Sequence, residues 1–314
     1  MGNVLLTRRI PSSVLTALQG RHTVDLYSGE GAIPRDELLQ RVAGKDALIC
    51  VLTDRIDAAV MDAGSSLKVV ANIAVGYDNI DVAEASRRSL IVTNTPDVLT
   101  EAVAELTWAL ILGIARRVGE GDRLIRRGGW KVWGLDFMLG TELHGKRLGI
   151  IGGGRIGRAV AAKAPAFGMS VAFSGRSASG AKNSATTVSL DELLVTSDVV
   201  SIHAPATPET RHLINKRTLA RMKRSALLVN TARGSLVDEE ALAWALDERL
   251  IAGAALDVFE REPDVPPSLI NHENVLLVPH LGSATRETRT AMADLAVRNV
   301  QSVLDGLGPL TPVT

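Results

Sequence analysis

A glycine-rich turn constrains this 314-residue chain more than any other feature of its sequence. Residues 152–157 read GGGRIG, directly after the apolar run 148–151 and at the opening of a helical pattern over 158–167. Strand, Gly-x-Gly-x-x-Gly and helix in this order form the dinucleotide-binding fingerprint of doubly wound α/β sheets. The chain is therefore expected to bind a dinucleotide coenzyme, which indicates redox chemistry.

Each glycine of the turn has its own expected task. Gly152 permits the tight turn out of the strand, Gly154 lets the backbone approach a pyrophosphate, and Gly157 allows close packing of helix on sheet. Arg155 and Ile156 stand at the helix N-terminus, whose unpaired N–H groups and dipole favour the negative charge of phosphates. Glycines also serve ordinary turns, so the prediction depends on the strand before the motif and the helix after it.

The residues after the next strand indicate which coenzyme is preferred. An acidic residue about 20 positions beyond the fingerprint usually binds the ribose 2′-hydroxyl. Here the strand-like run 170–174 is followed by Gly175-Arg176-Ser177, without an acid. Arg176 can pair with a 2′-phosphate and Ser177 can donate a hydrogen bond to it, which favours NADP over NAD. The simpler alternative is an arginine at a strand end that points into solvent.

Composition excludes several other classes of protein. Lys plus Arg and Asp plus Glu are balanced at 35 each, so nothing indicates a nucleic-acid or anionic-membrane surface. The single cysteine, Cys50, lies in an apolar run, which excludes a disulfide framework and a cysteine metal cluster and predicts a buried thiol. The N-terminus lacks a signal-peptide pattern, and no run reaches the roughly 18 apolar residues of a membrane span. We expect a soluble cytoplasmic protein that needs no metal.

Short apolar runs alternate with helical patterns along the chain, which predicts an α/β architecture with parallel sheets. Because the fingerprint comes after nearly half of the chain, a complete α/β unit must precede it. Residues 99–128 predict one or two helices that lead into the second domain, and 286–304 predict an amphipathic helix that could return to the first. The expected strands are residues 4–6, 23–26, 47–52, 69–73, 91–93, 148–151, 171–173, 199–203, 227–230, 253–256 and 275–278.

Three polar residues follow strand-like runs after the fingerprint: Arg233, Glu262 and His280. Open α/β sheets bind ligands at the carboxyl ends of their strands, so these side chains could share one cleft. A guanidinium binds a 2-oxo acid's carboxylate, an imidazolium protonates its carbonyl oxygen during reduction, and a neighbouring carboxylate favours the charged imidazole. Taken singly, each could instead be a turn residue, a loop histidine or a solvated charge.

With these residues and several further motifs, the chain resembles the D-isomer-specific 2-hydroxyacid dehydrogenases, in particular their glyoxylate/hydroxypyruvate reductase branch. The similarity covers almost its whole length. The further motifs are AVGYDNID at 74–81, TNTP at 93–96, LTEA at 99–102 and HAP at 203–205 with Thr210.

The resemblance implies two α/β domains of flavodoxin-like and Rossmann type, each built on a doubly wound parallel sheet. A discontinuous substrate-binding domain, 1–97 plus 284–314, would carry an inserted dinucleotide-binding domain, 98–283, with the substrate in the cleft between them. The family also implies a homodimer formed largely through the coenzyme domain, with the helices of 99–128 as contacts.

The resemblance assigns roles to single residues as well. Arg233 would bind the substrate carboxylate, His280 would donate the proton, and Glu262 would orient and charge His280. Further contacts are implied for the coenzyme at Thr100, Pro205, Thr210, Thr231 and, on the nicotinamide carboxamide, Asp257. Further contacts are implied for the substrate at Leu52, which would cover it, at the N–H groups of Val75 and Gly76, and at Ser283. For His203 a structural role is equally acceptable.

The implied function is an NADPH-preferring reduction of glyoxylate and hydroxypyruvate to 2-hydroxy acids, with His280 as proton donor. One alternative is a dehydrogenase for a larger acid such as phosphoglycerate, for which Arg55 could contact the phosphate. The other is a dinucleotide-sensing, corepressor-like binding protein, against which the retained catalytic residues argue. Many reductases of this branch have a Trp-x-Pro step where residues 133–137 read WGLDF, which leaves substrate preference open.

Overall fold

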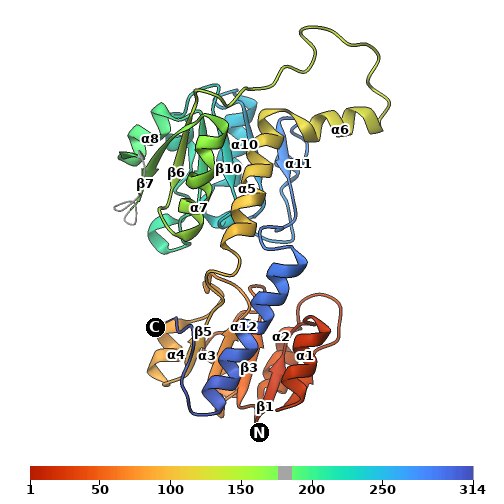
Figure 1. The fold of residues 1–314 in the computed structure, drawn as a ribbon, viewed down its shortest axis with the longest axis vertical. Coiled ribbons are helices and arrows are strands. Elements are labelled where there is room, and N and C mark those ends of the chain that lie inside the picture. Colours follow the sequence, from red (N-terminus) through yellow and green to blue (C-terminus); the bar gives the residue numbers. More distant parts are fainter. Residues whose placement is uncertain (176–185, 314) are drawn as a thin grey trace. The chain divides into compact units, whose positions relative to one another are not determined.

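The computed structural model describes residues 1–175 and 186–313 (Figure 1). The chain forms two compact units, Met1–Leu99 with Ala284–Thr314 and Thr100–Ser283. Each contains one parallel sheet with helices packed on it, so the predicted α/β class is confirmed. None of the helices in the described residues combines the length and hydrophobicity that crossing a bilayer requires.

The first unit is built on a five-stranded parallel sheet in the order β2-β1-β3-β4-β5, the order of flavodoxin-like folds. The strands are β1 Asn3–Leu6, β2 Thr23–Leu26, β3 Ala47–Cys50, β4 Val69–Asn72 and β5 Ile91–Thr93. The helices are α1 Ser12–Gln19, α2 Arg35–Val42, α3 Ala58–Ala63, α4 Val82–Arg87 and α12 Arg286–Leu304. All residues of β3 and β4 are buried, because helices cover both faces of the sheet.

The terminal helix α12 returns to this unit, as the sequence predicts. Thr285 caps it by accepting a hydrogen bond from the N–H of Thr288. Its small apolar face packs on one side of the sheet, in a cluster with the inward residues of β1, β3 and β4. Cys50 is fully buried on the opposite side, where burial raises the pKa of its thiol, in agreement with the expected structural role.

The second unit is built on a seven-stranded parallel sheet in the order β12-β11-β10-β9-β6-β7-β8. The strands are β6 Arg147–Ile151, β7 Ser170–Ser174, β8 Thr186–Thr187, β9 Val199–Ile202, β10 Leu227–Asn230, β11 Gly253–Leu256 and β12 Val275–Leu277. The helices are α5 Thr100–Ala115, α6 Val118–Arg126, α7 Arg155–Lys163, α8 Leu190–Thr196, α9 Lys216–Leu219, α10 Glu239–Asp247 and α11 Pro267–Ile270. Strand order reverses between β6 and β9, which is the Rossmann switch point where α/β sheets bind ligands.

Several predicted boundaries were wrong by a few residues. The helix after the glycine turn begins at Arg155 and becomes a 3₁₀ turn over Ala164–Phe167, where Pro165 removes a backbone donor. β3, β4, β9 and β12 stop one or two residues earlier than predicted, because the apolar run continues into the loop at the carboxyl edge. β8 was missed, since two exposed threonines give no apolar signal.

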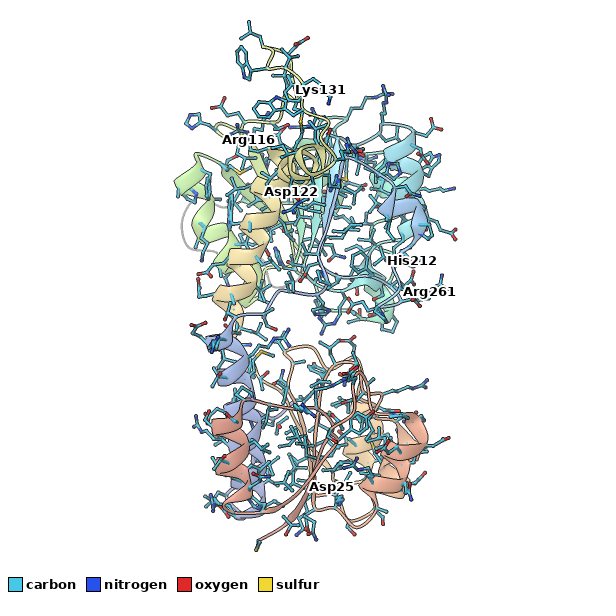
Figure 2. All side chains as sticks on the ribbon, turned by 90° about the vertical axis from the view of Figure 1, so that its right-hand side faces the viewer. Asp25, Arg116, Asp122, Lys131, His212 and Arg261 are labelled. Atoms are coloured by element: carbon cyan, nitrogen blue, oxygen red, sulfur yellow. The ribbon has the colours of Figure 1, made fainter. Side chains whose placement is uncertain are left out.

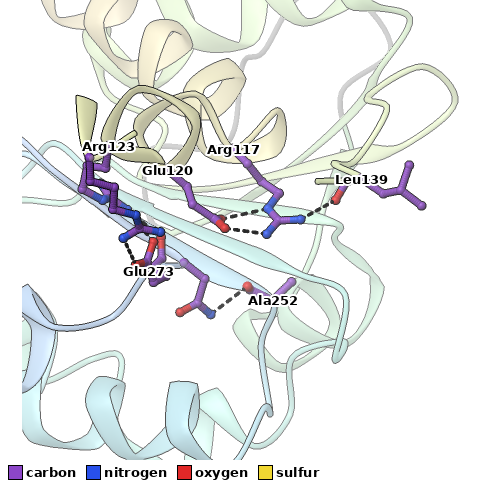
Figure 3. Close-up of polar contacts among 8 residues, drawn as sticks. Arg117, Glu120, Arg123, Leu139, Ala252 and Glu273 are labelled. Carbon is purple, nitrogen blue, oxygen red and sulfur yellow. Dashed lines mark hydrogen bonds and ion pairs between the residues drawn. The ribbon is translucent and has the colours of Figure 1, made fainter. Parts of the chain in front are cut away.

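The predicted helical stretch 99–128 is two helices that differ in how they are held. The chain turns at Arg117, whose φ of 55° is left-handed. α5 is largely buried, whereas α6 has no buried residue. Polar contacts hold α6 instead: Arg117 pairs with Glu120 at 2.6 Å within its first turn (Figure 3), and Arg127 contacts Glu273 at 2.7 Å outside the helix. Arg123 also donates to the backbone oxygen of Glu273 at 2.8 Å.

Trp108 joins α5 to the helix that follows the glycine turn. Its ring stacks on Phe167, with centroids 4.4 Å apart and planes at 20°. Its indole N–H donates to the carbonyl oxygen of Val160 at 3.0 Å. The ring is 4% exposed, so this contact is part of the core of the second unit.

We expect Trp108→Ala to lower the free energy of unfolding of the second unit by about 3–5 kcal/mol, because it leaves a cavity where the ring was. Trp133→Ala is the matched control; that ring is 68% exposed, and its loss should change stability by about 0.5 kcal/mol or less. Urea denaturation of both variants measures the difference, and equal losses would contradict the assignment of Trp108 to the core.

Candidate active site

The glycine turn lies at the switch point of the second sheet. Gly152 has a φ of 104°, and a Cβ there would lie 2.5 Å from the oxygen of His203. A Cβ on Gly157 would lie 2.1 Å from the oxygen of Gly152, so the fold itself requires both glycines. Gly154 is the N-cap of α7, and a Cβ on it would meet nothing within 4 Å. The open space at Gly154 and the helix N-terminus at Arg155 together fit the pyrophosphate of a dinucleotide.

The neighbouring loop, 203–210, is fixed by hydroxyl groups. The hydroxyl of Thr210 donates to the oxygen of Pro205 and accepts from the N–H of Thr207, each at 2.8 Å. Within the same loop, His203 shares a hydrogen bond of 2.8 Å with Ser201, and burial lowers its pKa to about 3. His203 is therefore neutral at physiological pH, which favours the structural role.

Arg176 and Ser177, on which the expected choice of NADP depends, lie outside the described residues. Gly175, directly before them, has a φ of 126°, a backbone conformation that only glycine adopts readily. The preference for NADP therefore stays a prediction from the sequence.

His280 and Glu262 form a hydrogen-bonded pair at the carboxyl edge of this sheet. The imidazole Nδ1 lies 2.7 Å from Glu262 Oε2, and the side chains are 26% and 24% exposed. Glu262 Oε1 accepts from the N–H of Phe259 at 3.0 Å, so both oxygens are oriented. His280 has a φ of 52°, a conformation that non-glycine residues rarely adopt and that is concentrated at functional sites.

Glu262 remains ionised in this arrangement. Burial is the largest single influence and would raise the pKa of its carboxyl group, but the hydrogen bond and charge of His280 act against it. The N–H of Phe259 and the charge of Arg233 act in the same direction, so the pKa of Glu262 lies below its ordinary value. An ionised Glu262 can thus accept a hydrogen bond from Nδ1 of His280 and leave the second ring nitrogen available to a substrate.

Asp257 has a structural task that the sequence did not reveal. Its carboxylate accepts from the N–H groups of Leu281 and, at 2.9 Å, Gly282, while its own carbonyl oxygen accepts from the N–H of His280 at 2.9 Å. The side chain is buried, and burial raises the pKa of its carboxyl group. Asp257 therefore fixes the loop that carries His280, and its expected contact with the nicotinamide carboxamide stays a prediction.

Arg233 follows β10 in a turn shaped by Asn230. The amide of Asn230 donates to the oxygen of Arg233 at 2.8 Å and accepts from the N–H of Ala232 at 3.0 Å. Thr231 is buried, and its hydroxyl lies 2.9 Å from that of Thr107 in α5. Sequence analysis missed Asn230 and Thr107, although a buried asparagine at a strand end is a signal of a shaped turn.

The expected substrate contacts of the first unit form a separate polar network. The oxygens of Val75 and Gly76 accept from the side-chain amides of Asn94 at 2.8 Å and Asn72 at 2.9 Å. The expected role of the N–H groups of Val75 and Gly76 as donors to a substrate anion stays a prediction from the sequence.

Asn79 fixes the turn that contains Leu52. Its side-chain amide donates to the oxygens of Val51 at 3.2 Å and Asp54 at 3.0 Å. These asparagines lie inside the AVGYDNID and TNTP motifs or just ahead of them, but their roles could not be read from the sequence. Of the remaining expected contacts, Thr100 is the first residue of α5 and Ser283 is the last residue of the second unit.

Comparison with known proteins agrees with this geometry. Residues 108–282 match the family model described as "D-isomer specific 2-hydroxyacid dehydrogenase, NAD binding domain". The chain is 46% identical to the glyoxylate reductase of Thermococcus onnurineus, over 99% of this chain and 95% of that protein. It is 48% identical to the glyoxylate reductase of Thermofilum pendens, over 98% and 92%.

Solved structures share the fold over the same length. The TT0316 protein of Thermus thermophilus superimposes with a TM-score of 0.94 at 48% identity, covering 99% of this chain and 100% of that one. The NADPH-dependent glyoxylate/hydroxypyruvate reductase of Sinorhizobium meliloti, solved with NADP and malonate, gives 0.88 at 34% identity, covering 99% and 96%.

We expect Gly157→Ala to destabilise the second unit by about 3 kcal/mol or more, because its methyl group would overlap the backbone of the glycine turn. Gly154→Ala should change stability by less than about 1 kcal/mol, yet raise the dissociation constant of the coenzyme roughly tenfold or more by blocking the approach of the phosphates. Thermal unfolding and coenzyme titration separate the two effects. Unimpaired coenzyme binding by Gly154→Ala would contradict the predicted phosphate site.

His280→Gln should raise the pKa of Glu262, because burial then acts without the opposing charge of the imidazolium. In the native protein the lowered pKa means that ionised Glu262 stabilises the fold above pH 4.5, the ordinary glutamate value; this stabilisation is lost as pH falls through the folded-state pKa. Carbon-13 NMR titration of the carboxyl group measures the change. His272→Gln is the control, since His272 pairs with Asp247 instead, and an unshifted Glu262 in His280→Gln would refute the coupling.

Proposed function

Because the chain belongs to the D-isomer-specific 2-hydroxyacid dehydrogenase family, we propose that it reduces small 2-oxo acids, glyoxylate and hydroxypyruvate, to 2-hydroxy acids. Family membership makes it an NAD(P)-dependent oxidoreductase. The observation that carries the proposal is the His280–Glu262 pair, 2.7 Å apart, in the unit that also contains the glycine turn. The glyoxylate reductases of similar sequence support the choice of substrate.

In the proposed reaction, a nicotinamide coenzyme bound at the glycine turn would supply a hydride to the carbonyl carbon of the 2-oxo acid. His280 in its imidazolium form donates a proton to the carbonyl oxygen as negative charge develops there. Glu262 holds the Nδ1–H and stabilises the positive charge of the ring. Arg233 binds the carboxylate through its guanidinium group, which is planar and donates two parallel hydrogen bonds.

The remaining contacts are proposed on the same basis. We assign Thr100, Pro205, Thr210, Thr231 and Asp257 to the coenzyme, with the glycine turn. We assign Leu52, Ser283 and the N–H groups of Val75 and Gly76 to the substrate. The side-chain amides of Asn94 and Asn72, which bind the oxygens of Val75 and Gly76, support this role because they hold that turn in place.

We also propose NADPH as the preferred coenzyme and a homodimer as the working form. Arg176 and Ser177 support the preference for NADPH, as does the NADPH-dependent reductase of similar structure.

The segment after α6, marked by Lys131 in Figure 2, supports the homodimer, because it exposes several large apolar side chains. These are Trp130, Val132, Trp133, Leu135, Phe137 and Leu139.

The purified protein should oxidise NADPH in the presence of glyoxylate or hydroxypyruvate, and more slowly with bulky or phosphorylated 2-oxo acids. Loss of absorbance of the reduced nicotinamide across a panel of these acids tests the proposal. Absence of turnover with every acid would refute the proposed activity, and faster turnover of a phosphorylated acid would favour the larger-acid alternative.

His280→Ala is the variant that ties this activity to the site. It should lower kcat by roughly 10²–10⁴-fold, the usual contribution of a general acid. Coenzyme affinity should be unchanged, since the glycine turn is intact. A kcat close to that of the native protein would exclude His280 as proton donor.

Arg176→Ala should raise KM for NADPH about 10–100-fold, the cost of losing a hydrogen-bonded ion pair with the 2′-phosphate. KM for NADH should not change, because NADH lacks that phosphate. Arg221→Ala is a suitable control; Arg221 pairs with Asp191 elsewhere in the same unit. Equal effects on both coenzymes would remove Arg176 from the proposed 2′-phosphate site.

A further inference from the structure

Glu260 lies two residues before Glu262 and joins its segment to a different loop. Its carboxylate accepts from Arg211, with Nη2 at 2.5 Å from Oε1, and from His212, with Nε2 at 3.1 Å from the same oxygen. Arg211 and His212 end the loop that begins after β9 and contains Thr210. Figure 2 labels His212 together with Arg261, the residue after Glu260.

The backbone of Glu260 is held from a second direction. Its N–H donates to Oε1 of Glu239, the first residue of α10, at 2.8 Å. Glu239 is 8% exposed, and burial raises the pKa of its carboxyl group. Burying a carboxyl group is unfavourable. Glu239 is buried nevertheless and accepts a hydrogen bond from the N–H of Glu260, which indicates that the position of the peptide between Phe259 and Glu260 matters.

The turn after Arg233 packs against the same peptide. A Cβ on Gly234 would lie 1.9 Å from the carbonyl carbon of Phe259 and 2.3 Å from the nitrogen of Glu260. The N–H of His212 donates to the oxygen of Ser235 at 2.8 Å. Three loops of the second unit therefore meet at the peptide between Phe259 and Glu260.

This peptide leads directly to the catalytic pair. The N–H of Phe259 donates to Glu262 Oε1 at 3.0 Å, and Glu262 Oε2 lies 2.7 Å from His280 Nδ1. A displaced Phe259 would remove the hydrogen bond that orients Glu262. The imidazole would then lose both its alignment and part of the charge that favours its protonated form.

We propose that Glu260 is a positioning residue: by binding Arg211 and His212 it fixes segment 259–262 and so aligns Glu262 with His280. Glu260 thereby makes the alignment of Glu262 with His280 depend on the position of residues 203–212, of which Pro205 and Thr210 are assigned to the coenzyme. The effect on turnover rests on the proposed function, whereas the effect on the His280–Glu262 hydrogen bond does not.

A merely structural ion pair would behave differently. The side chain of Arg211 is 58% exposed, and exposed ion pairs contribute little to stability. Removing such a pair would leave the hydrogen bond of His280 and the pH dependence of turnover as they are. Those two quantities therefore decide between the roles.

The first test is Glu260→Gln, with Glu273→Gln as matched control. Glu273 also pairs with two arginines of the second unit, Arg123 and Arg127, but belongs to a different contact (Figure 3). We expect Glu260→Gln to lower kcat by about 10–100-fold, the cost of a misplaced catalytic group, with KM for the 2-oxo acid little changed. The alkaline limb of the kcat profile should move to lower pH, as in Glu262→Gln, whereas Glu273→Gln should leave both unchanged.

The second test combines the two substitutions. If Glu260 acts through Glu262, adding Glu260→Gln to Glu262→Gln should lower kcat no further. Losses that multiply in the double variant would overturn the proposal. The double variant Arg211→Gln/His212→Asn should reproduce the effect of Glu260→Gln, and it serves if Glu260→Gln does not fold; asparagine suits the left-handed φ of 50° at residue 212.

The third test does not depend on turnover. Proton NMR of the protein should show a strongly downfield Nδ1–H resonance from His280, which Glu260→Gln shifts or broadens and Glu273→Gln does not. An unchanged resonance in Glu260→Gln would refute the positioning role. A changed resonance in a protein that reduces no 2-oxo acid would uphold the positioning role and refute the proposed function instead.

Discussion

The close approach of two backbones at the glycine turn is the constraint on which the second unit depends. A single methyl group on Gly157 would lie 2.1 Å from the oxygen of Gly152, so only glycine fits at this position in the first turn of α7. This contact sets the start of α7 against β6, next to the point where strand order reverses. The same contact leaves the helix N-terminus facing open space at Gly154, where phosphates can approach. Folding and coenzyme binding thus place the same demand on this turn.

Carboxylates fix the loops at the carboxyl edge of the sheet. Asp257 binds the N–H groups after His280, Glu262 binds that of Phe259, and Glu239 binds that of Glu260. Each uses a charged acceptor on backbone donors, which gives stronger and more directional hydrogen bonds than neutral acceptors do. Loops have few apolar contacts to hold them, so these bonds give the edge the rigidity that proton transfer needs.

Local sequence patterns predicted the features that depend on residues close together in the chain. Apolar runs located ten of the eleven predicted strands within one residue at each end and β3 within two, because a buried parallel strand is apolar throughout. The spacing of Arg233, Glu262 and His280 after strand ends indicated the pair that the structure brings together. Contacts between distant residues could not be predicted in this way. Asp257 binds residues 24 and 25 positions away, and Glu260 binds a side chain 48 positions away, so only the folded backbone reveals them.

The geometry around His280 argues for catalysis over simple coenzyme sensing. A protein that only bound a dinucleotide would need the glycine turn, but it would not need a histidine hydrogen-bonded to a half-buried glutamate. The left-handed φ of 52° at His280 costs about 1–2 kcal/mol for a residue other than glycine, and the N–H of His280 donates to the carbonyl oxygens of Asp257 at 2.9 Å and Val278 at 3.2 Å. The imidazole contacts Glu262, and this contact lowers the pKa of a half-buried carboxyl group that burial alone would raise. A left-handed backbone and a half-buried charge, both unfavourable to folding, occur together at this pair, which supports the proposed role of His280 as the general acid.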